Sequence, residues 1–248
     1  MNPYSSLCDD FGFHLSLNTK LPLPTSRETI LHFFEALQKI FPSLTDFECR
    51  DSGEFVLEEN RERGSYRWVM LEQRRLCSGY ANPPDLKTAD DFHLQVLEIA
   101  PFHLDITRLD CEALDLLFTF DFVFSGNHDE VVVEALGLNS PLEGLVQLPG
   151  IRVINYEPSL MLALDESCRL QCRLGIETRT NAFQVRTGQF PELPISVFFT
   201  IRQYWTRSGF KTFAEAYQQQ RGILQELVDN HIIPGVIRPL AQTIAAKQ

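Results

Sequence analysis

Residues 168–179 read Cys-Arg-Leu-Gln-Cys-Arg-Leu-Gly-Ile-Glu-Thr-Arg, an alternation of apolar and polar side chains with a period of two. This period predicts a half-buried β-strand, because successive side chains of a strand point to opposite faces. The side chains expected to face the core are Cys168, Leu170, Cys172, Leu174 and Ile176. Those expected on the opposite face are Arg169, Gln171, Arg173, Glu177 and Arg179. This concentration of guanidinium groups is the best candidate for a functional site in the sequence.

A neighbouring strand is expected to extend the same polar face. Residues 195–201 also alternate, and Arg202 and Tyr204 follow them directly. If the two strands pair, arginines and a tyrosine meet and can hold a carboxylate or phosphate by bidentate hydrogen bonds. The residues of this anion-binding hypothesis are Arg173, Glu177, Arg179, Arg202 and Tyr204. The simpler interpretation is ordinary Arg/Glu pairing on a wet sheet surface, worth about 0–1 kcal/mol per pair.

The composition limits the class of protein. The chain has 248 residues, of which 44% are hydrophobic and 22% are charged, so a full core and a globular fold are expected. The formal net charge of -11 disfavours non-specific binding to nucleic acid or to an anionic membrane, and leaves room for one small anionic ligand. No motif indicates a cofactor.

Neither a leader nor a membrane segment is predicted. Residues 1–10 lack the basic and apolar regions of a secretory signal, and no apolar run approaches the ~20 residues that span a bilayer. The six cysteines are therefore expected to be reduced thiols in a cytoplasmic protein. Cys168 and Cys172 would lie about 13 Å apart along one strand, which is too far for a disulfide.

The remaining pattern predicts an α+β fold of antiparallel sheet covered by helices. Strands are expected at 11–17, 47–57, 66–76, 118–124 and 195–201, with one or two more within 94–106, and helices at 25–40, after Asn127, and at the C-terminal end. Phe11 and Phe118, 107 residues apart, each begin a patterned strand that precedes a helix. We therefore expect an N-terminal α+β half at 1–110 and a C-terminal half with terminal helices at 111–248, packed closely or as one domain.

A short motif suggests an alternative function. Gly126-Asn-His-Asp129 follows a predicted strand, and Asp91-Phe-His93 lies upstream. These two blocks resemble signatures of the calcineurin-like metallophosphoesterases, and the resemblance implies a metal site at Asp91, His93, Asn127 and His128 that activates a hydroxide for phosphoester hydrolysis. The chain lacks the G-D-x-x-D block between them and the later histidines of that family. The simpler interpretation is that Asn127 caps a helix.

No other catalytic motif is present. The chain has no Gly-x-Ser-x-Gly elbow, phosphate-binding glycine loop or His-Glu-x-x-His helix, and no base for Ser78 or Ser125 can be identified in the sequence. The first hypothesis is therefore a non-catalytic binding or assembly module with an anion-binding arginine face. Its C-terminal helices are candidates for a homo-oligomer contact. The competing hypothesis is the metal-dependent phosphoester hydrolase.

Overall fold

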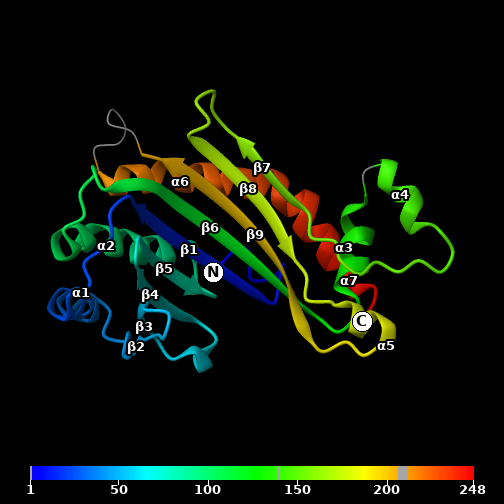
Figure 1. The fold of residues 1–248 in the computed structure, drawn as a ribbon, viewed down its shortest axis with the longest axis horizontal. Coiled ribbons are helices and arrows are strands. Elements are labelled where there is room, and N and C mark those ends of the chain that lie inside the picture. Colours follow the sequence, from blue (N-terminus) through cyan, green and yellow to red (C-terminus); the bar gives the residue numbers. More distant parts are fainter. Residues whose placement is uncertain (1, 139, 206–211) are drawn as a thin grey trace.

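A single nine-stranded sheet organises the molecule (Figure 1). The structure, a computed structural model, describes residues 2–138, 140–205 and 212–248. The strand order is β2-β3-β4-β5-β1-β6-β9-β8-β7, and all the described pairs are antiparallel. The strands are β1 (Asp10–Thr19), β2 (Asp46–Cys49), β3 (Phe55–Glu58), β4 (Tyr66–Glu72), β5 (Arg75–Ala81), β6 (Cys111–Phe124), β7 (Ser159–Ala163), β8 (Leu170–Glu177) and β9 (Leu193–Tyr204). The predicted α+β fold with antiparallel sheet is confirmed.

Helices cover one face of this sheet (Figure 1). The long ones are α1 (Arg27–Ile40), α2 (Leu86–Leu104) and α6 (Phe213–Leu227), which continues through a π-helical turn (Val228–Ile237) into α7 (Arg238–Ala245). Helices α3 (His128–Leu136) and α4 (Ser140–Val146) project beyond the sheet, and α5 (Ala182–Thr187) and the short turn η1 (Arg61–Arg63) lie in loops. No helix in the described part of the chain is long and apolar enough to span a bilayer.

The core lies between the sheet and these helices. The alternation of β1 and β6 sends their aromatic residues to the helix side, where Phe11, Phe13, Phe118 and Phe120 are at most 2% exposed. The Phe118 ring packs edge to face against Phe11 and Phe13, with centroids 5.1 and 4.8 Å apart. Such ring pairs add to the large apolar area that each side chain buries. The strands predicted at 11–17 and 118–124 are confirmed.

The order of elements repeats on either side of the central β1–β6 pair. Strand β1 precedes α1 and a meander that returns through β5 to pair with β1, and β6 precedes α3 and a meander that returns through β9 to pair with β6. Helices α2 and α6 follow the two returning strands. Phe11 pairs with Phe120 and Phe13 with Phe118, so the two similar stretches lie side by side at the centre of one continuous sheet. The division at residue 110 into two halves stays a prediction.

Several local predictions are wrong. Residues 94–106, expected as strand, belong largely to α2, because their apolar positions recur every three or four residues with Val96, Ala100 and Leu104 on the buried side. Each strand expected at 47–57 and 66–76 contains a tight turn and becomes a hairpin. The helix expected at 25–40 is confirmed, and it begins after the N-cap Ser26.

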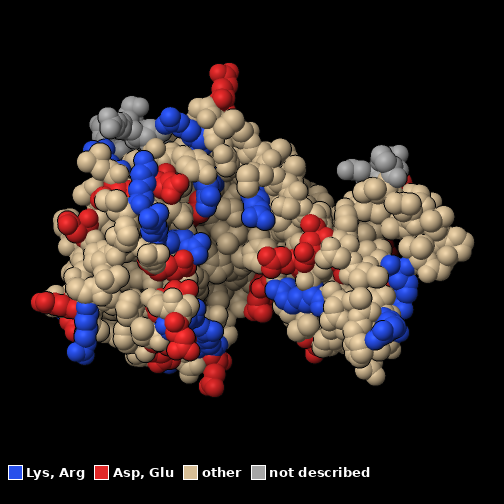
Figure 2. All heavy atoms as spheres, in the orientation of Figure 1, with Lys and Arg blue, Asp and Glu red and all other residues tan. Residues whose placement is uncertain are grey.

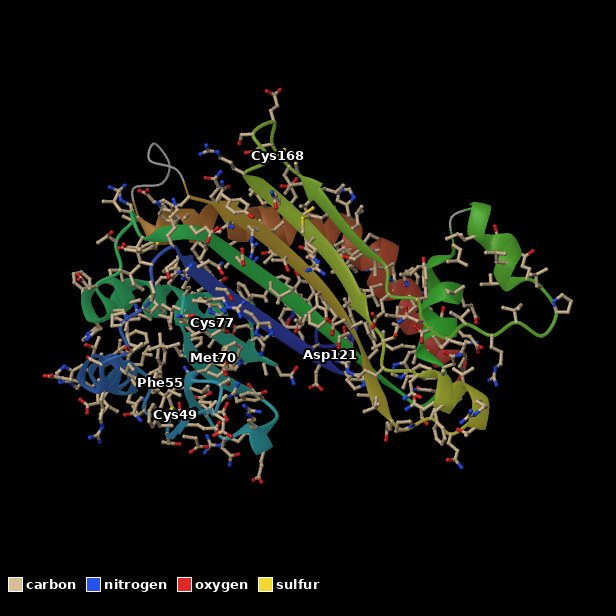
Figure 3. The ribbon with its side chains drawn as sticks, viewed as in Figure 1. Cys49, Phe55, Met70, Cys77, Asp121 and Cys168 are labelled. Carbon is tan, nitrogen blue, oxygen red and sulfur yellow. The ribbon has the colours of Figure 1, made fainter. Side chains whose placement is uncertain are left out.

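The prediction that Cys168 faces the core is also wrong. Cys168 lies in the turn between β7 and β8, exposed and with a left-handed φ of 56° (Figure 3). The strand begins at Leu170, and only Cys172 of the two thiols is buried. A polar turn of five residues interrupts the start of the alternation predicted for 168–179. In this turn the Asp165 side chain accepts the backbone N–H groups of Arg169 and Leu170.

Candidate functional site

The sheet face opposite the helices, called here the open face, carries the predicted polar residues. On β8, Gln171, Arg173, Gly175 and Glu177 point to this face, because they pair with the open-face residues of β9. The space-filling view shows that this face is hollowed near its centre and that acidic and basic side chains both gather on it (Figure 2). Antiparallel sheets often leave one face to solvent.

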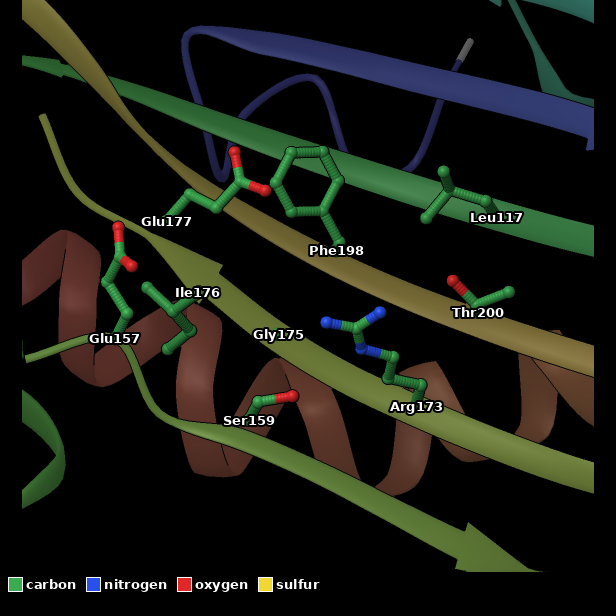
Figure 4. A pocket seen from close by; sticks show the side chains of 9 residues that line it. All are labelled: Leu117, Glu157, Ser159, Arg173, Gly175, Ile176, Glu177, Phe198 and Thr200. Atoms are coloured by element: carbon green, nitrogen blue, oxygen red, sulfur yellow. The ribbon is translucent and has the colours of Figure 1, made fainter.

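Two adjoining hollows meet at Arg173. The larger has a volume of about 340 Å³ and is lined by Leu117, Glu157, Ser159, Arg173, Gly175, Ile176, Glu177, Phe198 and Thr200 (Figure 4). The smaller, of about 140 Å³, is lined by Met161, Gln171, Cys172, Arg173, Thr200 and Arg202. Both volumes suit part of a small molecule rather than a large cofactor.

Arg173 is the cation of the larger hollow. Its side chain folds over Gly175, where a Cβ would lie 4.0 Å from the Arg173 Nε, and its guanidinium points toward Phe198 and Thr200 (Figure 4). Among the described residues it forms no ion pair or side-chain hydrogen bond. An exposed guanidinium with five unused donors in a hollow is able to bind a planar anion with two hydrogen bonds.

Arg202, the second predicted cation, is already paired. Its Nε and Nη2 donate to the two carboxylate oxygens of Asp115 at 2.7 and 2.6 Å, and Asn18 donates to the same carboxylate at 3.0 Å. The hydrogen-bonded carboxylate of Asp115 raises the pKa of Arg202 further above its ordinary value. Tyr204 lies beside this pair, with its ring 5.9 Å from the Arg202 guanidinium carbon. This group is electrically neutral, so it borders the site without attracting an anion.

Arg179 does not reach the open-face hollows. It follows β8, and its Nη1 donates to the carbonyl oxygen of Pro194. Its backbone N–H donates to Nδ1 of His128 at 3.2 Å. Of the five residues predicted for the anion site, the structure brings Arg173 and Glu177 into one hollow and places Arg202 in the adjoining one.

A row of directly paired residues, called here the central row, runs across the open face to Arg173. In strand order it contains Trp68, Gly79, His14, Leu117, Thr200, Arg173 and Met161. Trp68 lies flat over Gly79, since a Cβ at position 79 would meet the indole at 2.3 Å. The His14 ring is 5.6 Å from the Trp68 ring, and burial lowers the pKa of His14 to about 4, so its imidazole is neutral at pH 7. The row supplies a largely aromatic and apolar floor beside the Arg173 cation.

A second row near one end of the strands is acidic. Asp10, Asp121, Ser196 and Glu177 are paired directly across β1, β6, β9 and β8 and form what is called here the acidic row. Burial, together with the charge of Asp10, raises the pKa of Asp121, and the Ser196 hydrogen bond and Arg179 partly oppose this. Glu157 joins Glu177 at the wall of the larger hollow. One hollow therefore has a cation at one end and carboxylates at the other.

The residues of the metal hypothesis serve structural roles. Asp91 pairs with Lys87 on the exposed side of α2. Asn127 is the N-cap of α3, accepting from the backbone of Asp129 and Glu130, and Nε2 of His128 lies 3.1 Å from the Phe124 carbonyl oxygen. Throughout residues 2–138, 140–205 and 212–248, no group of three or more His, Cys, Asp or Glu side chains is arranged to hold a metal ion.

The structure reveals a Ser–His pair that the sequence did not. Ser78 Oγ on β5 lies 2.8 Å from Nδ1 of His93 on α2, and both residues are 0% exposed. Burial is the main reason that the pKa of His93 is lowered to about 3. No substrate can approach a fully buried hydroxyl, so the pair satisfies two polar groups inside the core rather than forming a nucleophile.

Other site residues were missed because they are far apart in the sequence. Leu117, Phe198 and Thr200 join the hollow only through the β6–β9 register. A weak signal in the sequence indicated that this strand also has a polar face. Asp115 and Asp121 interrupt an otherwise apolar run and are an even number of residues apart, so they share one face of a strand.

Comparisons with known proteins give no family for this chain. No family model matches it, and no curated protein matches it in sequence. Two solved structures of alkyldihydroxyacetonephosphate synthase, in crystal forms P212121 and P1, align with 96% of the chain at 9% and 11% identity and TM-scores of 0.19 and 0.14. The alignments span 44% and 43% of the synthase chains, so this chain is less than half their length. Similarity this low indicates neither a shared fold nor a shared activity.

Proposed function

We propose that the protein is a non-catalytic binding module whose open face takes a small zwitterionic ligand, with an anionic group on Arg173 and a cationic group toward Glu177 and Glu157. The observation that carries this proposal is the exposed Arg173 guanidinium, without an ion-pair partner among the described residues, in a hollow of about 340 Å³. A guanidinium forms bidentate hydrogen bonds with a carboxylate or phosphate.

The charges of the hollow favour a zwitterion over a simple anion. Arg173 contributes one positive charge, and Glu157 and Glu177 contribute two negative charges, so a purely anionic ligand meets net repulsion. Arg173 and Glu177 are four residues apart on β8, about 13 Å between Cα atoms, and their side chains reduce the span that a ligand has to bridge. Leu117 and Phe198 supply an apolar floor between the charges.

The cytoplasm is the proposed location. The six cysteines are free thiols in the structure, and proteins of reducing compartments retain such thiols. Amino acids and short peptides, which are small zwitterions, are the first probes to test.

Calorimetric titration tests the proposal with the common free amino acids as zwitterions and with acetate and inorganic phosphate as purely anionic probes. We expect at least one amino acid to bind more tightly than either anion. Arg173→Ala and Glu177→Gln should each weaken that binding at least tenfold, which corresponds to about 1.4 kcal/mol. The matched control is Arg169→Ala, an exposed arginine just outside β8 that does not line the hollows. No heat with any amino acid at millimolar concentration, or equal affinity in Arg173→Ala, would reject the proposal.

A further inference from the structure

The two edges of the sheet are built differently. Edge strand β2 reads Asp46-Phe-Glu-Cys49 and carries two carboxylates in four residues. Edge strand β7 reads Ser159-Leu-Met-Leu-Ala163, with no charge and no proline. Charged residues on an edge strand oppose pairing with another chain, and an uncharged apolar edge invites it. Strand β7 therefore lacks the protection that β2 has.

Strand β7 also carries exposed apolar side chains. Of the 14 large hydrophobic side chains that are exposed in the described part of the chain, three are consecutive residues of this short strand. On β7 itself Leu160, Met161 and Leu162 are 53%, 62% and 47% exposed. Single exposed apolar residues are ordinary, but three in a row on an unprotected edge strand favour contact with another chain.

The outer side of β7 also presents backbone groups that no described strand pairs with. Leu164 donates to the Leu170 carbonyl, and the Pro158 carbonyl accepts from Ile176, so the even-numbered residues turn their backbone groups toward β8. The N–H and C=O groups of Ser159, Met161 and Ala163 consequently point away from the sheet. Figure 4 shows the same arrangement, with β7 as the outermost strand beside β8.

We propose that β7 pairs in antiparallel fashion with β7 of a second copy of this chain, about a two-fold axis at Met161. The strand is symmetric in character about that residue, because a small residue lies at each end and a leucine on each side of the methionine. Rotation about the axis places Met161 opposite itself, Leu160 opposite Leu162 and Ser159 opposite Ala163. A two-fold interface requires such a self-complementary surface.

The pairing satisfies the outward backbone groups of β7 and buries its exposed apolar side chains. Each outward residue of one copy exchanges backbone hydrogen bonds with its opposite residue in the other copy. Leu160 and Leu162 of the two copies pack together on the helix side of the joined sheet, which removes their exposed area from water. Met161 lines the smaller hollow of the open face, so the partner strand would lie directly beside that hollow. The proposal does not depend on the identity of the ligand.

The ends of the strand limit the length of the pairing. The same axis brings Glu157 of one copy toward Asp165 of the other, but each carboxylate already accepts a backbone N–H of its own chain, from Thr178 at 3.1 Å and from Arg169 at 2.8 Å. The contact is therefore expected to cover the five residues of β7 and no more. Residual repulsion between these carboxylates predicts that the dimer tightens as salt increases.

Cysteine cross-linking tests the register, in a background where the exposed Cys49 and Cys168 are replaced by serine. Met161→Cys should give a disulfide-linked dimer on mild oxidation, because directly opposite residues with exchanged hydrogen bonds have Cα atoms about 5.5 Å apart, within disulfide range. Ser159→Cys is the matched control, since its two copies would be about 13 Å apart. Equal cross-linking of the two variants would overturn the proposal.

Light scattering after gel filtration tests the assembly without cross-linking. The native chain should elute with the mass of two copies, and Met161→Lys, which places two ammonium groups together at the axis, should weaken the dimer at least tenfold. Phe47→Lys on edge strand β2 is the control and should leave the mass unchanged. A native chain that is monomeric at 100 micromolar, or a Met161→Lys variant that remains dimeric, would contradict the proposal.

Discussion

The two faces of the sheet use alternate residues of the same strands for different purposes. On β6, Phe118 points to the helices and is 0% exposed among other aromatic rings, and the adjacent Leu117 points to the open face and is half-buried beside Thr200. One peptide unit separates a residue that holds the fold together from a residue that lines the candidate site. Alternation along a strand thus allows stability and binding to be varied separately.

The largest effect is expected from truncation on the covered face. Phe118→Ala removes a ring that packs against Phe11, Phe13 and Tyr4, and should cost about 3 to 5 kcal/mol of unfolding free energy. Leu117→Ala, one residue away on the open face, should cost about 1 kcal/mol, because only part of its apolar area is buried. Urea unfolding measures both. Equal losses would show that the open face is as densely packed as the covered one.

A smaller loss is expected where the open face itself is tightly packed. Gly79→Ala puts a methyl group 2.3 Å from the Trp68 ring, so the indole has to leave its place over β5. Overpacking of this kind costs about 1 to 3 kcal/mol, and Trp68 fluorescence should shift in a Trp205→Phe background. Gly222→Ala on the exposed side of α6, where nothing lies within 4 Å, is the control and should stabilise the helix slightly. An unchanged emission spectrum would show that the Trp68 indole does not lie over Gly79.

The buried imidazole of His93 predicts an acid-sensitive core. Its folded pKa of about 3 lies below the ordinary value of 6.5, so the unfolded chain binds the proton first. The contribution of neutral His93 to the unfolding free energy is present above pH 6.5 and is lost as the pH falls. At pH 5.5 the loss from this residue is about 1.4 kcal/mol. His93→Gln should reduce the loss of unfolding free energy between pH 7.5 and 5.5 by that amount and leave the contribution of His14. The control is His32→Gln at an exposed position, which should show the same pH dependence of the unfolding free energy as the native chain. The same pH dependence in His93→Gln would contradict the lowered pKa of His93.

The covered face was largely predictable from the sequence, because burial imposes a period on it. The alternation at 11–17 and 118–124 and the helical spacing at 30–40 follow from local geometry alone. The second half of α2, from residue 94, was mistaken for strand, since Pro101 and a dense apolar run obscured the three-to-four spacing that its buried residues follow. Two hairpins were read as single strands because their turns carry no Asn-Gly or Pro-Gly signal.

The candidate site was predictable only in part. The sequence placed Arg173, Glu177 and Arg202 on one face, which the register of β8 and β9 confirms. The partner of Arg202 is Asp115, 87 residues away, and no local pattern reveals which strand lies next to which. Arg179 was included because the alternation was extended two residues beyond the end of β8. Long-range register, rather than local propensity, decides which charges remain free.

The smallest effect on stability should accompany the largest effect on binding, at Arg173. The side chain is exposed and unpaired among the described residues, so Arg173→Ala should change the unfolding free energy by no more than about 0.5 kcal/mol. Calorimetric titration of this variant with the amino acid that binds the native chain most tightly is the most direct test of the proposed site. We predict at least a tenfold loss of affinity in a fully folded variant, and native affinity in Arg173→Ala would contradict the account.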